Sequence, residues 1–260
     1  MRLPGYLRFA MTGFVSSTRQ IGGTRWYVRE STAEPEDPEH LVIFIPGLGE
    51  GAYIAPHGSL LARHWRVVIP DMPGFGRSRG PHRLTSVDAF AEAATEFVAD
   101  RADGAVYLVG SSFGAQVALA VAAAAPRLLT RLVLVSPTFE AGSRTLLGQL
   151  RRWLPTMVGE PSLLAVGLAK SYAHSGLRTP ILAFRAGLHD APEERAPRVS
   201  APTLVVRGGR DHIVSARWAR QLVDCLPAGQ LATIAGGWHT LDFALPGALA
   251  AVTVRFLQDS

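Results

Sequence analysis

The sequence predicts an α/β fold, in which a mostly parallel, twisted sheet is flanked by helices and carries a helical insertion. Apolar runs of strand length recur along the chain, and segments of helical period separate several of them. Between Phe139 and about Arg198, by contrast, only helical patterns occur. Strands that alternate with helices form βαβ units, whose consecutive strands lie parallel.

The chain is expected to begin with a hairpin, because residues near Thr12–Thr18 and Arg25–Arg29 flank the turn signal Gly22-Gly23. The acidic, proline-containing stretch Ser31–His40 is expected to form a loop. Six apolar runs then predict strands, and most are continuously apolar, as strands covered by helices on both faces should be. These runs are Leu41–Ile45, Arg66–Ile69, Ala105–Val109, Arg131–Val135, Thr203–Arg207 and Leu231–Ala235.

Helices are predicted between these strands at Ser86–Asp100, Ala115–Ala125 and Ser215–Leu226. The first shows apolar residues at three- and four-residue spacing, and Thr85 or Ser86 can cap its start. The interval from Phe139 to about Arg198 is expected to form several short amphipathic helices that lie above the carboxyl edge of the sheet. We therefore expect a core of residues 1–138 and 199–260 with a helical lid of residues 139–198. The expected breaks between the lid helices are Pro155, Pro161, Gly176 and Pro180.

Composition excludes several classes of protein. With 48% hydrophobic and 18% charged residues, the 260-residue chain is not expected to be disordered. One cysteine, Cys225, excludes a disulfide framework and favours a reducing compartment. Arg8 interrupts the short apolar segment after Arg2, which argues against a signal peptide and for a cytoplasmic protein. The net charge of +5 comes from scattered arginines, so no nucleic-acid partner is expected.

The uncharged stretch Gly104–Pro126 is long enough to resemble a membrane span. Two glycines, two serines and a glutamine interrupt its middle, where a span would be most apolar. They divide it into a strand and a buried helix, each shorter than the roughly 20 residues that a bilayer requires. No integral membrane association is expected.

The interruption itself carries a chemical signal. Gly110-Ser111-Ser112-Phe113-Gly114 stands between a predicted strand and a predicted helix, the context required for a G-x-S-x-G nucleophile elbow. Ser112 would lie at the helix N-terminus, where the Phe113 amide and the helix dipole can stabilise an oxyanion. Ser111 is the competing nucleophile, and a plain structural turn is the alternative to any chemistry.

A serine nucleophile needs a base and an acid that orients the base. His239 follows the last predicted strand, so a parallel sheet delivers it to the same edge as Ser112. Asp211 follows the strand at Thr203–Arg207 and completes the chain order Ser, Asp, His. Glu140 is the other acid within reach. Surface or packing roles are expected for the remaining histidines: His40, His57, His64, His82, His174, His189 and His212.

These motifs together resemble the α/β-hydrolase fold superfamily, in its serine-nucleophile, single-domain form with a lid. Two further stretches are similar to the family's patterns: Asp71–Ser78 matches the turn D-x-P-G-x-G-x-S, and Pro202–Val206 matches the entry into the penultimate strand. The resemblance implies that Leu48 supplies the second oxyanion-hole amide. Family members commonly have His-Gly where this chain has Pro46-Gly47, which puts the support of the hole in question.

The resemblance implies a serine hydrolase that cleaves an ester, thioester or related acyl bond of a small, partly apolar substrate through an acyl-enzyme. A non-hydrolytic enzyme (lyase, C–C bond cleavage or cofactor-free oxygen chemistry) and a catalytically silent ligand-binding protein stay open as alternatives. The oligomeric state is left open. No metal cluster or phosphate loop is visible, so no metal or cofactor is expected. Residues expected to contact the substrate are Trp153, Met157, Tyr172, Phe184 and Trp238.

Overall fold

A computed structural model describes residues 12–80 and 84–259, apart from the side chains of Lys170 and His174. The segment around Arg2 and Arg8, on which the expectation about a signal peptide rests, lies outside this range, as does His82. The fold is an eight-stranded sheet in the order β1-β2-β4-β3-β5-β6-β7-β8. Its strands are β1 (Phe14–Ile21), β2 (Thr24–Ser31), β3 (Asp37–Ile45), β4 (Trp65–Pro70), β5 (Ala105–Ser111), β6 (Arg131–Val135), β7 (Thr203–Gly208) and β8 (Gly229–Ile234).

The sheet is mixed but mostly parallel, which confirms the predicted fold class. β1 and β2 form the expected antiparallel hairpin, and β2 also pairs antiparallel with β4. Every other pairing in the sheet is parallel. The carboxyl ends of β3, β5, β6, β7 and β8 therefore meet at one edge, which is where the loops that carry the candidate residues begin.

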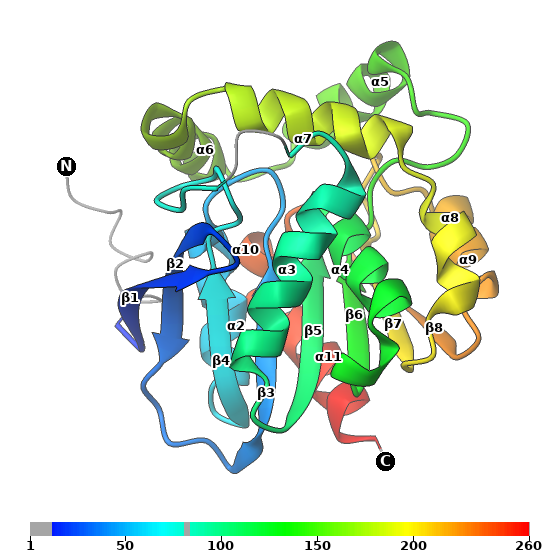
Figure 1. The fold of residues 1–260 in the computed structure, drawn as a ribbon. Helices are drawn as coiled ribbons and strands as arrows, with labels where there is room; N and C mark the ends of the chain where they lie inside the picture. Colours follow the sequence, from blue (N-terminus) through cyan, green and yellow to red (C-terminus); the bar gives the residue numbers. More distant parts are fainter. Residues whose placement is uncertain (1–11, 81–83, 260) are drawn as a thin grey trace.

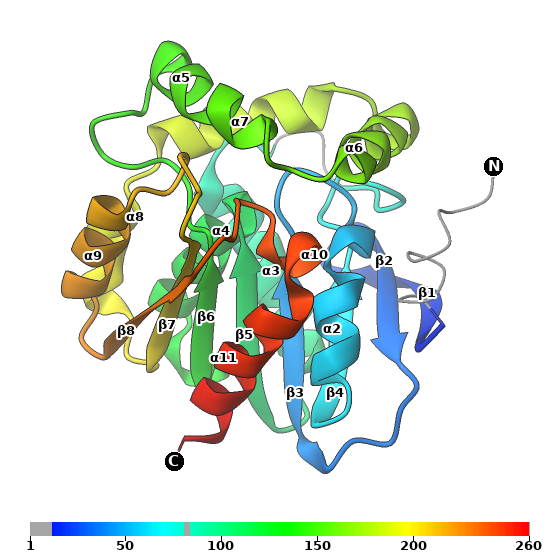
Figure 2. The ribbon, with the colours of Figure 1, turned by 180° about the vertical axis from the view of Figure 1, so that it is seen from behind.

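Helices cover both faces of the sheet (Figures 1 and 2). The strands alternate their side chains between two apolar layers. In β3, Ile43 and Ile45 face the layer under α3, α4 and α9, whereas Val42 and Phe44 face the layer under α2 and α11. Burial on both faces explains why these runs are continuously apolar. The helices are α2 (Ala55–Leu61), α3 (Val87–Arg101), α4 (Phe113–Ala124), α9 (Ala216–Asp224), α10 (Leu241–Ala244) and α11 (Pro246–Gln258), with short 3₁₀ turns at Gly51–Ile54, Pro126–Leu128 and Ala196–Arg198.

Between β6 and β7 the chain forms only helices, α5 (Leu146–Met157), α6 (Ser162–Ser175), α7 (Arg178–His189) and α8 (Pro192–Arg195). Figures 1 and 2 show α5, α6 and α7 lying across the carboxyl end of the parallel strands. Apart from Val15, every strongly exposed large apolar side chain of the described residues lies between Leu146 and Ile181. Part of this segment is anchored in the core, since Ala183 and Ala186 of α7 are buried with α3 and α4.

Several predicted boundaries are wrong. β3 begins at Asp37 within the expected loop, pairs there with Trp65, and continues after a register shift. Pro155 does not separate two helices but lies inside α5, near its end. Pro180 occupies the first turn of α7, where a proline removes no intrahelical hydrogen bond. Helices α2 and α11 had not been predicted at all.

The uncharged stretch Gly104–Pro126 divides, as predicted, into strand β5 and helix α4. Ten of the twelve residues of α4 are buried, so its apolar character reflects packing within the protein. Within residues 12–80 and 84–259, no helix combines the length and apolar character needed to cross a membrane.

Candidate active site

Ser112 lies on a sharp turn between β5 and α4. Its backbone angles, φ 56° and ψ −121°, are a conformation that residues with a side chain rarely adopt. The flanking glycines are required by close packing: a Cβ on Gly110 would lie 2.6 Å from Cβ of Ala118, and one on Gly114 would collide with the Ile45 carbonyl. Packing of Gly110 against α4 and of Gly114 against the end of β3 therefore requires glycine at both positions of the G-x-S-x-G turn.

A continuous hydrogen-bonded chain joins the three residues that the sequence singled out. Oγ of Ser112 lies 2.9 Å from Nε2 of His239, and Nδ1 of His239 lies 2.8 Å from Oδ2 of Asp211. The other oxygen of Asp211 accepts the amides of Ile213 and Val214, at 2.8 and 3.1 Å. The carboxylate is thus buried and fully bonded, which fixes the plane of the imidazole.

His239 is held from several sides. Its backbone carbonyl accepts the Ser136 hydroxyl at 2.8 Å, and its side chain is 12% exposed. Burial of the ring disfavours its charged form, but the Asp211 carboxylate, together with smaller contributions from Glu160 and Asp242, outweighs this effect. The pKa of His239 consequently lies above its ordinary value. The imidazole is thereby made a stronger base than a free histidine.

Two backbone amides are candidates for an oxyanion hole. Phe113 is the first residue of α4, so its N–H has no partner within the helix. Leu48 lies in the turn after β3, and its carbonyl accepts the Tyr172 hydroxyl at 2.8 Å. The Gly47 amide donates to the Tyr53 hydroxyl at 2.7 Å. With Pro46 in place of the family's usual histidine, Tyr53 and Tyr172 hold this turn from two sides.

A second serine–carboxylate–histidine cluster lies behind the first. The Ser111 hydroxyl donates to Oδ2 of Asp242 at 2.7 Å, and Oδ1 of Asp242 lies 2.8 Å from Nδ1 of His57. Asp242 and His57 are fully buried, and Ser111 nearly so. Tyr53 borders the same smaller cavity as Ser111. Burial first, and then Asp242, raises the pKa of Tyr53, which keeps the phenol protonated.

Sequence reasoning gave His57 a surface or packing role and kept Ser111 only as a competing nucleophile. It missed Asp242 and Tyr53 altogether. The one available signal was an aspartate inside the apolar stretch Leu241–Ala244. A lone carboxylate in a buried position needs partners.

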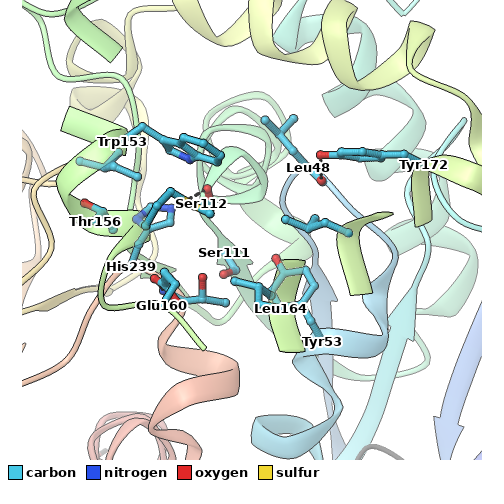
Figure 3. Close-up of a pocket in the computed structure, with 14 residues that line it drawn as sticks. Leu48, Tyr53, Ser111, Ser112, Trp153, Thr156, Glu160, Leu164, Tyr172 and His239 are labelled. Atoms are coloured by element: carbon cyan, nitrogen blue, oxygen red, sulfur yellow. Dashed lines mark hydrogen bonds between the residues drawn. The ribbon is translucent and has the colours of Figure 1, made fainter. Parts of the chain in front are cut away.

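The candidate residues face two cavities. The larger cavity, of about 720 Å³, lies between Ser112 and helices α5 and α7, and Phe184 lines it. The smaller cavity, of about 140 Å³, lies on the side of Thr240, Glu160 and Met157. Ser112, His239, Leu48, Trp153 and Tyr172 border both. Figure 3 shows Trp153 on one side of the Ser112–His239 pair and Tyr172 on the other.

Two residues considered from the sequence lie elsewhere. Glu140, the alternative acid, pairs with Arg152 at 2.7 Å. Trp238 lines neither cavity; its indole packs beside His212 and under the Arg210 guanidinium, and Gly159 leaves room for it. Although Trp238 immediately precedes His239, the backbone sends the two side chains in different directions. Among the described residues, no three His, Cys, Asp or Glu side chains are grouped to hold a metal ion.

Comparisons with known proteins identify the family of the chain. The family model described as serine aminopeptidase, S33, matches residues 36–243. The chain is 31% identical over 248 residues to the polyketide synthase ThaQ of Burkholderia thailandensis, covering 84% of this chain but 12% of that protein. It is 29% identical over 213 residues to 2-hydroxymuconate semialdehyde hydrolase of a Pseudomonas species, covering 71% of this chain and 74% of the relative.

Structural comparison shows the same fold. The enol-lactonase from Burkholderia xenovorans LB400 superposes with a TM-score of 0.79 at 18% identity, covering 94% of this chain and all of the other. The resemblance stated from the sequence motifs is confirmed: the chain has the α/β-hydrolase fold and belongs to the serine aminopeptidase S33 family.

Proposed function

We propose that the protein is a serine hydrolase that cleaves an ester, thioester or related acyl bond of a small, partly apolar substrate. The observation that carries this proposal is the hydrogen-bonded chain from Ser112 through His239 to Asp211, placed on a strained elbow beneath the larger cavity. The three residues come from separate loops at one sheet edge, and they occur in the order Ser, Asp, His typical of this fold.

In the proposed first step, His239 removes the proton of Ser112 as Oγ attacks the substrate carbonyl. Asp211 holds the imidazole in place and stabilises its charged form. The Leu48 and Phe113 amides receive the developing oxyanion, each contributing about 3–4 kcal/mol to lowering the barrier. The protonated His239 then gives its proton to the leaving group, which departs and leaves an acyl-enzyme.

In the second step, His239 takes a proton from a water molecule as the water attacks the acyl carbonyl, and the same two amides stabilise the second oxyanion. The bond between the acyl carbon and Oγ of Ser112 then breaks, the acid leaves, and His239 returns the proton to Oγ. Residues 139–198 act in this proposal as a lid that covers the acyl-enzyme. Their position across the sheet edge and their apolar side chains facing Ser112 support that role.

The test is labelling with a fluorophosphonate probe followed by turnover of an ester and thioester panel. Wild-type protein is expected to label once per chain and to hydrolyse at least one acyl substrate. Ser112→Ala should do neither. Ser111→Ala serves as the matched control and should still label, because its hydroxyl is committed to Asp242.

Absence of labelling in folded wild-type protein would contradict the proposed nucleophile, and labelling of Ser112→Ala would assign the reaction to another residue. Labelling at Ser112 without turnover of any ester or thioester would contradict hydrolysis and favour the non-hydrolytic alternatives. A protein that binds ligands in the larger cavity but neither reacts with the probe nor hydrolyses any substrate would match the alternative of a catalytically silent ligand-binding protein.

A further inference from the structure

We infer that the larger cavity is the acyl-chain site, so that the enzyme acts on esters or thioesters of a fatty acyl group joined to a small leaving group. This inference rests on the proposed function. It depends on three features of the cavities: their lining, their position relative to His239 and their unequal volumes.

The lining of the larger cavity suits an alkyl chain. Leu150 of α5, Ile181 and Phe184 of α7 and Phe139 supply its walls. Its polar side chains are mostly engaged within the protein: Tyr172 donates to the Leu48 carbonyl, and Gln149 donates to the Ser143 carbonyl at 2.8 Å. A ligand there meets apolar surface and gains from burial, with few hydrogen bonds offered to it.

The mouth of the cavity is also apolar. Leu146, Leu177 and Ile181 line the cavity and are nevertheless 70%, 59% and 56% exposed. They therefore stand at its border with solvent, on the facing helices α5 and α7 and the turn before α7. An alkyl chain can therefore enter between these helices past apolar side chains. Among the described residues that line the cavity, Arg185 is the one Arg, Lys, Asp or Glu.

The residues that border only one cavity indicate which cavity takes which part of the substrate. The leaving group must lie where His239, which borders both cavities, can protonate it. The smaller cavity lies on the side of Thr240, the residue after His239, whose amide donates to Glu160 at 2.8 Å. The larger cavity includes Phe113, whose amide would bind the carbonyl oxygen of the acyl group. This places the leaving group in the smaller cavity and the acyl chain in the larger one.

The volumes set the expected sizes. A water-sized group, comparable with a methylene, occupies about 30 Å³ of liquid. At that size the larger cavity, about 720 Å³, holds an eight-carbon chain with space to spare. The smaller cavity, about 140 Å³, holds roughly four or five such groups. A short alcohol or thiol portion fits there, whereas a second long chain does not.

The experiment measures kcat/KM for two ester series with wild-type protein. Methyl esters of C2 to C12 acids vary the acyl group, and octanoate esters of methanol to hexanol vary the leaving group. We expect kcat/KM to rise from C2 to C8 by up to about fourfold per methylene, the equivalent of about 0.8 kcal/mol per buried CH₂. In the second series, kcat/KM should fall beyond butanol.

Three variants separate the two cavities. Leu150→Trp fills the larger cavity and should move the acyl optimum to shorter chains by at least two carbons, with the alcohol preference unchanged. Leu147→Trp is the matched control on the same helix, because Leu147 is 57% exposed and lines neither cavity. Leu164→Trp narrows the smaller cavity and should lower the rate for butyl relative to methyl octanoate, leaving the acyl optimum in place.

Leu150→Ala provides a second test should the tryptophan variant not fold, and it should lengthen the acyl optimum. The inference is overturned if labelled, active protein hydrolyses C2 as well as C8 esters, or if Leu150→Trp alters alcohol rather than acyl preference. If Ser112 is not labelled and no ester is hydrolysed, the proposed function itself has failed, and the two failures are thereby distinguished.

Discussion

Two adjacent serines, Ser111 and Ser112, stand at the head of two hydrogen-bonded clusters of the same residue types. In one, the histidine lies between serine and carboxylate: Ser112, His239, Asp211. In the other, the carboxylate lies between serine and histidine: Ser111, Asp242, His57. Ser112 and His239 border both cavities, whereas Asp242 and His57 are fully buried and line neither; of the second cluster only Ser111 borders the smaller cavity.

The order of the hydrogen bonds distinguishes the cluster proposed to be catalytic from the cluster proposed to be structural. The Ser112 proton faces an imidazole nitrogen that can take it, while the Ser111 proton faces a carboxylate that already accepts a second hydrogen bond. Nε2 of His57 has no hydrogen-bond partner within the described part of the chain, and no cavity reaches it. Residue composition alone would not tell these clusters apart; connectivity and access do.

Replacing each of the two serines by alanine tests this contrast most directly. Ser112→Ala is expected to lower kcat by a factor on the order of 10⁶, because the nucleophile is lost. Ser111→Ala is expected to lower it by no more than about tenfold, the equivalent of one neutral hydrogen bond. Single-turnover hydrolysis of an ester substrate, with folding checked by circular dichroism, measures both. Equal losses would mean that the two clusters are not functionally distinct.

Replacing Asp211 should mainly lower kcat, whereas replacing Asp242 should mainly lower the free energy of unfolding. Asp211→Asn is expected to lower kcat by about 10⁴ with little change in stability, since the imidazole loses its orientation. Asp242→Ala leaves two buried partners unpaired and should lower the free energy of unfolding by about 3–5 kcal/mol, while the folded enzyme keeps most of its kcat. Urea denaturation and steady-state kinetics at low temperature separate the two quantities. The reverse pattern would assign the catalytic acid to Asp242.

Tyr53 lies between the Ser111 cluster and the turn that carries Leu48: its hydroxyl accepts the Gly47 amide at 2.7 Å, and Asp242 of that cluster raises its pKa. Tyr53→Phe should loosen the turn that carries Leu48 and lower kcat about 2- to 10-fold with KM nearly unchanged, the scale of one hydrogen bond. Tyr27→Phe, which alters a tyrosine that contacts Arg77 away from both cavities, is the control. A change confined to KM would instead place the effect in substrate binding.

The smallest effect concerns the pH profile. Because the proposed base must be neutral and the pKa of His239 is raised, activity should fall as pH drops through a midpoint above the ordinary histidine value. Glu160→Gln removes one of the negative charges that favour the protonated ring, so the midpoint of kcat/KM should move to lower pH. A midpoint that moves upward or stays fixed would show that Glu160 does not act on His239.

Much of this arrangement could be predicted from the sequence. The strands are continuously apolar because helices bury both faces, and the parallel order places the residues after β5, β7 and β8 at one edge. The G-x-S-x-G turn could be recognised because the packing against Ile45 and Ala118 leaves no room for side chains at Gly110 and Gly114. These features are local, and each leaves a mark on residue type or spacing.

The rest depends on contacts between distant segments. His57 and Asp242 are separated by 185 positions, and nothing near either residue indicates their pairing. The support of the Leu48 turn by Tyr53 was equally invisible, since no motif marks a tyrosine whose hydroxyl accepts the Gly47 amide. Trp238 was expected to contact the substrate but lines neither cavity, because adjacency to His239 in the sequence does not determine which way a loop side chain points.

The strained elbow also makes Ser112 a reporter of folding. The hydrogen-bonded chain at Ser112, which we propose makes this serine a nucleophile, requires loops that follow β5, β7 and β8, strands distributed over more than a hundred residues of chain. Contacts between segments so far apart in sequence form slowly compared with local helices and hairpins. A probe that reacts with Ser112 therefore counts molecules whose sheet is complete. Refolded protein that has native helix content but lacks correct strand pairing would remain unlabelled.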